Sequence, residues 1–431
     1  MIRAGVVGAG YVGLTTAVCV AERGVDTVSV DTDQARVEML TAGLSPIDEP
    51  DLEDAMRAGM AAGLLRFTDQ FDALADRDVV FVCVPTPSGA DGAADLRAVD
   101  AVADRLADVL APDAVIAVKS TVPVGTTRRL TERVAHRGIR VVSTPEFLRE
   151  GHAVHDSRHP DRVVIGAFGD AEAEVALHAC GTADAPVLRM SPESAELAKY
   201  ACNAFLAVKL SYANSLAQLA SALDADVTDV TSCMGADPRI GGAFLAPGPG
   251  WGGSCLPKDT AALLHLAHQV DVPVAEVRAC RETNAAQADR VVAALGRAMT
   301  APWESATVAA LGLTFKAGIS DTRDSPALEV CLRLAETGAQ VHAFDPRLSA
   351  IDPEIVKAAR ATPIDDPYQA MKAVDAVVVL TEWPEFRDLD WAAVAEGASD
   401  AVVIDTRNLL DRDVVERAGL TYLGNGRPAG Y

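Results

Sequence analysis

One cysteine in the second half of the sequence has the surroundings of a nucleophile. Cys255 follows the glycine-rich segment Gly250-Trp251-Gly252-Gly253-Ser254 and precedes Leu256-Pro257-Lys258-Asp259. Pro257 is typical of a first helical turn, so we expect Cys255 on a flexible glycine loop at a helix N-terminus. The helix dipole and Lys258 both favour a thiolate there. The alternative, a small buried apolar residue, is the prediction for Cys19, Cys83, Cys202 and Cys331.

A glycine pattern near the N-terminus is typical of dinucleotide binding. Gly8-Ala9-Gly10-Tyr11-Val12-Gly13 separates an apolar run from a helical one, and Asp31 ends the next apolar run 21 positions after Gly10. Glycines let backbone amides approach a pyrophosphate, and the acid can accept from ribose hydroxyls. Asp31 would repel a 2′-phosphate, which favours NAD over NADP, although Arg36 leaves NADP open. The alternative is an ordinary glycine-rich turn.

Acids and hydroxyls follow two further apolar runs. Glu146 and Glu150 come after Pro145, four positions apart. A helical turn there would point both carboxylates the same way, as acid–base chemistry or the binding of sugar hydroxyls requires. The spacing fits an exposed helix start equally well. Thr121 ends another strand, at the edge where α/β sheets bind ligands.

Lys199 and Asn203 lie four positions apart in a long helical run with apolar neighbours. A buried ammonium group is costly without a partner, so Lys199 must meet an acid, a ligand or water, unless it extends to solvent. The eight histidines show no metal-ligand spacing, and we predict no metal.

The elements that position these residues alternate between strand and helix at both ends of the chain, which indicates parallel sheets. A run without Gly or Pro from Pro192 to about Leu223 predicts one long helix between them. The predicted fold class is α/β, with two doubly wound Rossmann-like domains joined by a long central helix. The predicted boundaries are 1–190, 191–300 and 301–431. The expected strands are 2–7, 26–31, 78–84, 114–119, 140–143, 162–167, 307–311, 340–344, 376–380 and 401–404.

The composition narrows the classes of partner. The 431 residues include 38 Lys and Arg against 61 Asp and Glu, a net charge of −23, so nucleic acid and membrane surfaces are not expected partners. No run reaches the roughly 20 apolar residues of a membrane span, and the N-terminus enters a strand without a secretory leader. The eight scattered cysteines predict reduced, mostly buried thiols. These features together predict a cytoplasmic protein.

Taken together, these residues resemble the UDP-glucose/GDP-mannose dehydrogenase family. The resemblance implies an NAD-binding domain (1–190), a helical dimerisation region with the cysteine loop (191–300) and a C-terminal domain that binds the UDP part of a nucleotide sugar (301–431). The matching blocks, in family order, are Gly8–Gly13, Ser120–Thr126, Pro145–Gly151, Glu196–Phe205, Arg239–Gly241, Gly250–Asp259, Phe315-Lys316, Asp321–Arg323 and Asp405–Asn408.

The family oxidises the C6 alcohol of a nucleotide sugar to a carboxylate with NAD, through thiohemiacetal and thioester intermediates on the cysteine. The forms of Gly252–Asp259 and Phe244–Gly250 resemble those of enzymes that convert UDP-glucose to UDP-glucuronate. GDP-mannose is the alternative substrate, and a UDP-N-acetylhexosamine is a weaker one. Trp251 stands where the family usually has Phe or Tyr, and its ring could stack on a sugar or a base.

The resemblance also implies roles for single residues. It assigns the nucleophile to Cys255, oxyanion donation to Lys199 and Asn203, proton transfer to Asp259, and the holding of a water to Glu150 and Thr121. Arg239 would reach the substrate from a neighbouring subunit, which implies a homodimer built on the long helix. Cofactor contacts are assigned to Gly8, Gly10, Tyr11, Val12, Gly13, Asp31, Arg36, Thr86, Thr121, Glu150, Lys258 and Arg323. Substrate contacts are assigned to Glu146, Phe147, Leu148, Lys199, Asn203, Arg239, Phe244, Leu245, Gly252, Lys316 and Arg407.

Overall fold

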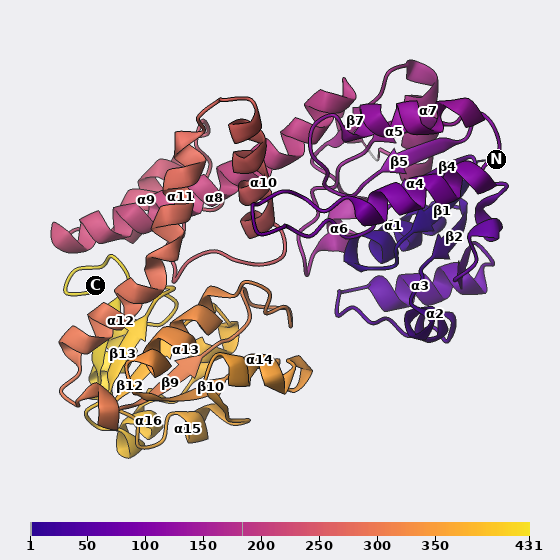
Figure 1. Cartoon of the computed structure of the whole chain (residues 1–431). Coiled ribbons are helices and arrows are strands. Elements are labelled where there is room, and N and C mark those ends of the chain that lie inside the picture. The colour runs from indigo at the N-terminus through magenta and orange to yellow at the C-terminus, as the bar shows by residue number, and fades with distance from the viewer. Residues whose placement is uncertain (1, 183) are drawn as a thin grey trace. The chain divides into compact units, whose positions relative to one another are not determined.

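The computed structural model describes residues 2–182 and 184–431. Two compact units make up the chain, and Figure 1 shows the elements of each. One unit is Met1–Cys202 with Ala261–Val272, and the other is Asn203–Thr260 with Pro273–Tyr431.

The first unit is built on an eight-stranded sheet in the order β3-β2-β1-β4-β5-β6-β7-β8. Neighbouring strands are parallel except at β6 and β7, which pair antiparallel through Ser143 and Gly166. The order reverses between β1 and β4, and ligands bind at such a switch point in open α/β sheets. The strands are β1 (Arg3–Val7), β2 (Asp26–Val30), β3 (Leu65–Thr68), β4 (Val79–Val82), β5 (Val115–Val118), β6 (Arg140–Ser143), β7 (Val163–Gly166) and β8 (Val187–Met190).

Helices cover both faces of this sheet because its central strands are apolar on both sides. Alternate residues of β4 show the division: Val79 and Phe81 belong to one hydrophobic cluster, and Val80 and Val82 belong to another. The helices are α1 (Tyr11–Glu22), α2 (Gln34–Thr41), α3 (Leu52–Ala61), α4 (Arg97–Val109), α5 (Thr126–Val134), α6 (Ala153–Arg158) and α7 (Asp170–Cys180), with 3₁₀ turns at Phe71–Leu74 and Ala135–Arg137.

The second unit repeats this winding with six parallel strands in the order β11-β10-β9-β12-β13-β14, so its switch point lies between β9 and β12. The strands are β9 (Thr307–Leu311), β10 (Gln340–Phe344), β11 (Thr362–Pro363), β12 (Ala376–Val379), β13 (Val402–Asp405) and β14 (Thr421–Gly424). The helices after β9 are α13 (Pro326–Glu336), α14 (Pro353–Ala358), α15 (Pro367–Ala370), α16 (Trp391–Gly397) and α17 (Arg412–Arg417), with 3₁₀ turns at Leu348–Ala350 and Pro384–Asp388.

Helices occupy most of the chain between the two sheets. The longest, α8, has 31 residues, which at 1.5 Å per residue gives about 45 Å. These helices are α8 (Pro192–Ala222), α9 (Val227–Ala236), α10 (Leu256–Gln269), α11 (Ala275–Ala285) and α12 (Gln287–Ala298), followed by a 3₁₀ turn at Trp303–Ser305. The predicted fold class is confirmed, whereas the predicted domain boundaries stay a prediction. None of the described helices is both long and apolar enough to cross a membrane.

Candidate functional site

The glycine loop after β1 leaves its helix N-terminus open. Gly8 has a φ of +94°, and a Cβ on Gly13 would lie 1.7 Å from the carbonyl oxygen of Gly8, so both positions require glycine. A Cβ on Gly10 would meet nothing within 4 Å. Gly10 is also the N-cap of α1, and no side chain caps that helix. The first amides of α1 are therefore available to a phosphate.

Asp31 lies at the end of β2, beside this loop. Its carboxylate accepts from the amides of Ala9 at 2.7 Å and Asp33 at 2.9 Å, and it pairs with Arg36 at 3.0 Å. Burial alone would raise the pKa of Asp31, but these hydrogen bonds and the Arg36 charge lower it on balance. Asp31 therefore stays ionised, as the recognition of a ribose requires. The open amides and this acid fit a dinucleotide.

Lys199 meets an acid, as its burial requires. Its Nζ donates to Glu146 Oε1 at 3.0 Å and to the Glu146 carbonyl oxygen at 2.6 Å, and both side chains are nearly inaccessible. Burial opposes the charge on Glu146, but Lys199 and the Leu148 amide lower the pKa of this carboxyl. The prediction that Lys199 has a partner is confirmed, and its extension to solvent is excluded.

The expected helical turn after Pro145 is wrong. Residues 144–149 are irregular, and the next helix, α6, begins only at Ala153. Glu146 is buried against Lys199, so the alternative of an exposed helix start is also wrong. The long-range ion pair, and not a local helix, sets the direction of this carboxylate. Phe147 beside it lies under the guanidinium of Arg162, 4.0 Å from the ring centre.

Cys255 is positioned by α10, as predicted. Its carbonyl oxygen accepts from the Asp259 amide at 2.9 Å, which places Cys255 at the N-cap. The preceding glycines are sites of close packing and do not form a flexible loop. A Cβ on Gly252 would lie 1.8 Å from the Asp324 carbonyl oxygen, and one on Gly253 would lie 2.8 Å from the Phe315 ring. The expected flexibility is therefore wrong at these two positions, where the backbone needs the space.

Asp259 lies one turn into α10 and is 1% exposed. Asn203 Nδ2 donates to its Oδ2 at 2.6 Å, and Lys258 Nζ donates to its Oδ1 at 2.5 Å. All three are among the predicted site residues, but the pattern along the chain does not predict that they contact each other. Asn203 and Lys258 compensate the buried negative charge of Asp259.

The Trp251 ring does not stack on a ligand, contrary to the expectation. It is buried in a small apolar cluster with Ala207 and Cys280, and its Nε1 donates to Ser211 Oγ at 2.9 Å. The extra size of the indole fills the space between α8 and α11, and its N–H finds a partner there.

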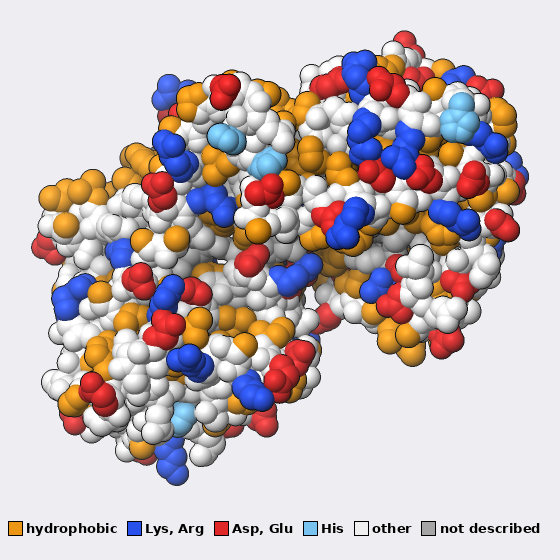
Figure 2. Space-filling model, viewed as in Figure 1, with side chains coloured by type: hydrophobic (Ala, Val, Ile, Leu, Met, Phe, Trp, Pro, Cys, Tyr) orange, Lys and Arg blue, Asp and Glu red, His pale blue; other side chains and the backbone are white. Residues whose placement is uncertain are grey.

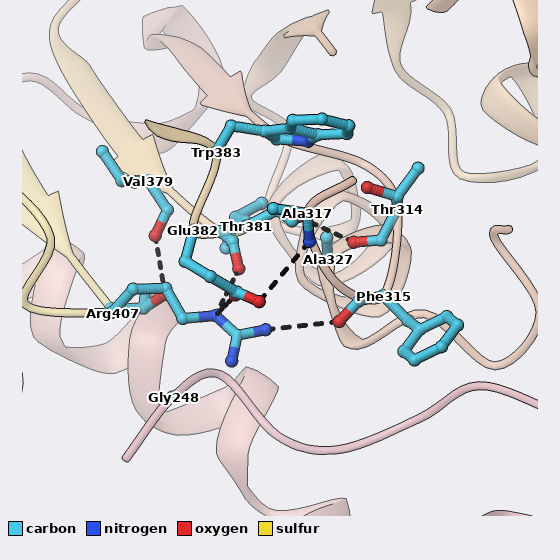
Figure 3. Close-up of polar contacts among 12 residues, drawn as sticks. Gly248, Thr314, Phe315, Ala317, Ala327, Val379, Thr381, Glu382, Trp383 and Arg407 are labelled. Carbon is cyan, nitrogen blue, oxygen red and sulfur yellow. Dashed lines mark hydrogen bonds and ion pairs between the residues drawn. The ribbon is translucent and has the colours of Figure 1, made fainter. Parts of the chain in front are cut away.

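A polar cluster lies at the carboxyl ends of β9, β12 and β13 (Figure 3). Arg407 Nε donates to the Leu380 carbonyl oxygen at 2.9 Å and pairs with Glu382 Oε2 at 3.2 Å. Its guanidinium packs on Gly248, where a Cβ would lie 2.7 Å from Nη1. Glu382 was not predicted, although it follows β12 in the second sheet just as the predicted Thr121 follows β5 in the first sheet.

Other predicted substrate residues differ in their exposure. Phe244 is 36% exposed with a φ of +63°, whereas Leu245 beside it is buried. Arg239 and Arg323 are exposed, and each pairs with an aspartate two positions earlier, Asp237 and Asp321. Thr86 donates to the Thr121 carbonyl oxygen at 2.8 Å, which joins the ends of β4 and β5.

All eight cysteines lie in the described part of the chain and are free thiols. Burial raises the pKa of Cys83 and of Cys331 to about 12, and it also raises the pKa of Cys19. Cys202, predicted to be buried, is only partly so, and Cys233 is exposed. Burial also raises the pKa of Cys180 and of Cys280, and three of the four thiols predicted to be small apolar residues have raised pKa values.

An open glycine loop, an acid after the second strand and a doubly wound parallel sheet are the features of a dinucleotide-binding domain, and the second unit has a sheet of the same winding. Three models of the UDP-glucose/GDP-mannose dehydrogenase family match the chain: its NAD binding domain at residues 2–179, its central domain at 193–286 and its UDP binding domain at 309–412. The chain belongs to this family.

Individual relatives agree with this assignment. A UDP-glucose 6-dehydrogenase of Pseudomonas aeruginosa is 41% identical over 99% of this chain and 98% of its own. The structure of a UDP-glucose dehydrogenase from Pyrobaculum islandicum matches with a TM-score of 0.88 and 36% identity, over 99% of this chain and 98% of the other. A UDP-D-ManNAc dehydrogenase from Pyrococcus horikoshii matches with a TM-score of 0.89 but only 26% identity, over 99% of this chain and all of the other. The prediction of an NAD-dependent nucleotide-sugar dehydrogenase is confirmed.

Proposed function

We propose that this enzyme oxidises the C6 alcohol of UDP-glucose to UDP-glucuronate, with Cys255 as the nucleophile. The observation that carries the proposal is the place of Cys255 at the N-cap of α10, one turn before the buried group of Asp259, Asn203 and Lys258. A helix N-terminus favours a thiolate. The higher identity to the UDP-glucose enzymes supports UDP-glucose over the N-acetylated alternatives.

The residues of the first unit fit NAD, which supplies a hydride acceptor when bound. The amides that follow Gly10 would hold its pyrophosphate, and Asp31 would hold a ribose. Arg36 already forms an ion pair with Asp31, so the charge of its guanidinium is compensated within the protein and does not require a 2′-phosphate. This pairing supports NAD over NADP.

A cysteine is needed for the second oxidation step, which starts from an aldehyde. An aldehyde has no alkoxide from which a second hydride can leave. The aldehyde is the product of a first hydride loss from the C6 alcohol, and addition of the Cys255 sulfur to its carbon gives a tetrahedral thiohemiacetal. Loss of a second hydride from that carbon, for which a second NAD would be the acceptor, leaves a thioester, which water cleaves to the acid. We assign stabilisation of the oxyanion to Lys199 and Asn203, proton transfer to Asp259, and the holding of the water to Glu150 and Thr121.

We assign the nucleotide part of the substrate to the second unit, at the edge of the sheet that carries Arg407 (Figure 3). Arg407 and Lys316 would offset the two phosphates in a chain whose net charge is −23. We also assign contacts with the substrate to Phe244, Leu245 and Gly252. Glu146, Phe147 and Leu148 would contact the sugar.

The experiment that tests this function supplies UDP-glucose, GDP-mannose and UDP-N-acetylglucosamine in parallel and compares kcat/KM. UDP-glucose should give the highest value, with two NADH formed per molecule of acid. A preference for GDP-mannose would select the alternative substrate. A yield of one NADH, with turnover unchanged in Cys255→Ala, would refute the covalent mechanism.

We further propose a homodimer built on α8. Phe205, Tyr212 and Leu219 are exposed and lie seven positions apart, on one face of that helix. Figure 2 shows hydrophobic side chains gathered on the surface over the α8 and α9 end of the second unit. A second copy of the chain is the partner that this apolar stripe fits.

The dimer can be tested together with the assignment of Arg239 to the neighbouring subunit. Arg239→Ala and Cys255→Ser should each be inactive as pure variants. If Arg239 acts across the interface, a mixed dimer keeps one intact site, and random reassociation should restore about a quarter of wild-type activity. No recovery after verified subunit exchange would place Arg239 in its own subunit's site.

We place the enzyme in the cytoplasm. All eight cysteines are free thiols, which a reducing compartment preserves.

A further inference from the structure

Glu49 is a buried acid in a loop of the first unit that is otherwise largely open to solvent. It lies between α2 and α3, and it is 7% exposed, whereas its neighbours Asp48 and Pro50 are exposed. None of the roles assigned above uses it. A carboxylate at such depth needs several hydrogen-bond donors to offset the loss of water.

The donors come from two separate parts of the chain. Glu49 Oε2 accepts from the Tyr11 hydroxyl and from the Gly151 amide, the latter at 2.8 Å. Glu49 Oε1 accepts from the Ala153 amide at 2.6 Å and from the Val154 amide at 3.4 Å. The Gly151 amide also donates to the Tyr11 hydroxyl oxygen at 2.8 Å, which closes a triangle.

Two of these partners, Tyr11 and Gly151, end the loops that follow β1 and β6 at the same edge of the sheet. Tyr11 begins α1 directly after Gly10, and Gly151 directly follows Glu150. The loops leave β1 and β6, which are separated in the sheet by β4 and β5. Three strand spacings are about 14 Å, too far for the two loops to hold each other by the ladder alone. The Tyr11 side chain nevertheless brings its hydroxyl to 2.8 Å from the Gly151 amide, and Glu49, on a loop outside the sheet, accepts from both groups.

We infer that Glu49 is a positioning residue for the cofactor. By fixing Tyr11 and Gly151 together, it sets the distance between the amides of the glycine loop and Glu150. The inference rests on the proposed assignment of both loops to NAD. The negative charge matters because four donors converge on two oxygens. A glutamine would turn one of those oxygens into a donor that faces another N–H.

The test compares Glu49→Gln with Asp54→Asn, which removes an equal charge from an exposed position in α3. NAD affinity is measured by titration, the KM for NAD by steady-state kinetics, and the folded fraction by circular dichroism. Glu49→Gln should bind NAD about tenfold more weakly, the effect of one lost buried hydrogen bond to a charged group, while Asp54→Asn stays within twofold of wild type. A purely structural role would lower the folded fraction and leave the affinity of the folded enzyme unchanged.

A double-mutant cycle identifies the route of the effect. If Glu49 acts through the Tyr11 hydroxyl, the loss caused by Glu49→Gln should be smaller in a Tyr11→Phe background. Full additivity would overturn the role of Tyr11. Should Glu49→Gln fail to fold, Tyr11→Phe alone carries the test, and unchanged NAD affinity in it contradicts the inference. Wild-type enzyme that binds no NAD would refute the proposed function, whereas normal binding by both wild type and Glu49→Gln would refute only the positioning role.

Discussion

Asp31 and Asp345 occupy equivalent places in the two sheets. Each follows the second strand of its sheet and accepts, at 2.7 Å, from the amide two residues beyond the first strand: Ala9 for Asp31 and Leu313 for Asp345. Their surroundings differ. Asp345 also accepts from the Thr314 amide and from Trp383 Nε1, and it is 1% exposed. We assign Asp31 to a ribose of NAD, whereas the contact with Trp383 helps to bury Asp345.

This difference predicts that an Asp-to-Asn substitution affects NAD binding in the first sheet and stability in the second. Asp31→Asn should weaken NAD binding about tenfold, because an acceptor for the ribose is lost. Asp345→Asn should leave NAD affinity unchanged and lower the free energy of unfolding by about 1–3 kcal/mol, because buried donors lose their acceptor. NAD titration and denaturant unfolding of both variants measure the two effects. Equal losses of NAD affinity would refute the distinction.

The pair of Glu146 and Lys199 predicts a pH-dependent stability. The pKa of Glu146 is lowered below its ordinary value of 4.5, so its ionised form stabilises the fold above that pH, and this contribution disappears as the pH falls through the lowered pKa. Glu146→Gln should lower the free energy of unfolding by about 3 kcal/mol at pH 7, because Lys199 then loses its buried counter-charge. Denaturant titrations from pH 7 to pH 3 measure the difference from wild type. A difference that grows toward low pH would contradict the assignment.

Close packing of the cysteine loop predicts sensitivity at Gly252. Gly252→Ala would place a Cβ 1.8 Å from the Asp324 carbonyl oxygen, so the loop that carries Cys255 must shift. We expect a loss of about 2 kcal/mol in unfolding free energy together with a loss of activity. Gly397→Ala is the control, since its Cβ meets nothing within 4 Å at the end of α16. Comparable unfolding curves for the two variants would show that the loop is loose.

The pattern of residue types along the chain predicted strands better than it predicted contacts between distant side chains. The central strands were found because they are apolar on both faces, whereas the four edge strands, β3, β8, β11 and β14, were missed because they are short and most of their residues are half-exposed or exposed. Cys255, Asp31 and Lys199 stood out because their types conflict with their neighbours. Glu49 and Glu382 did not, since their importance comes from distant partners.

Two of the wrong expectations have the same physical cause. A spacing of four after Pro145 suggests a helix, but the ion pair from Glu146 to Lys199 on α8 joins residues 53 positions apart and keeps the loop irregular. An aromatic ring beside glycines suggests ligand stacking, but Trp251 is buried and its N–H donates to the Ser211 hydroxyl. Local patterns do not contain such long-range partners.

The central claim is that the sulfur of Cys255 bonds to the oxidised sugar carbon. Wild-type enzyme mixed with UDP-glucose and NAD, quenched in acid within the first turnovers, should show by mass spectrometry a thioester-linked nucleotide sugar on the peptide that contains Cys255. Cys255→Ser, treated identically, should show no thioester, and its rate of acid formation should fall by a factor of about a thousand or more. Acid formation by Cys255→Ser at the wild-type rate, with no adduct on the wild-type peptide, would contradict the account.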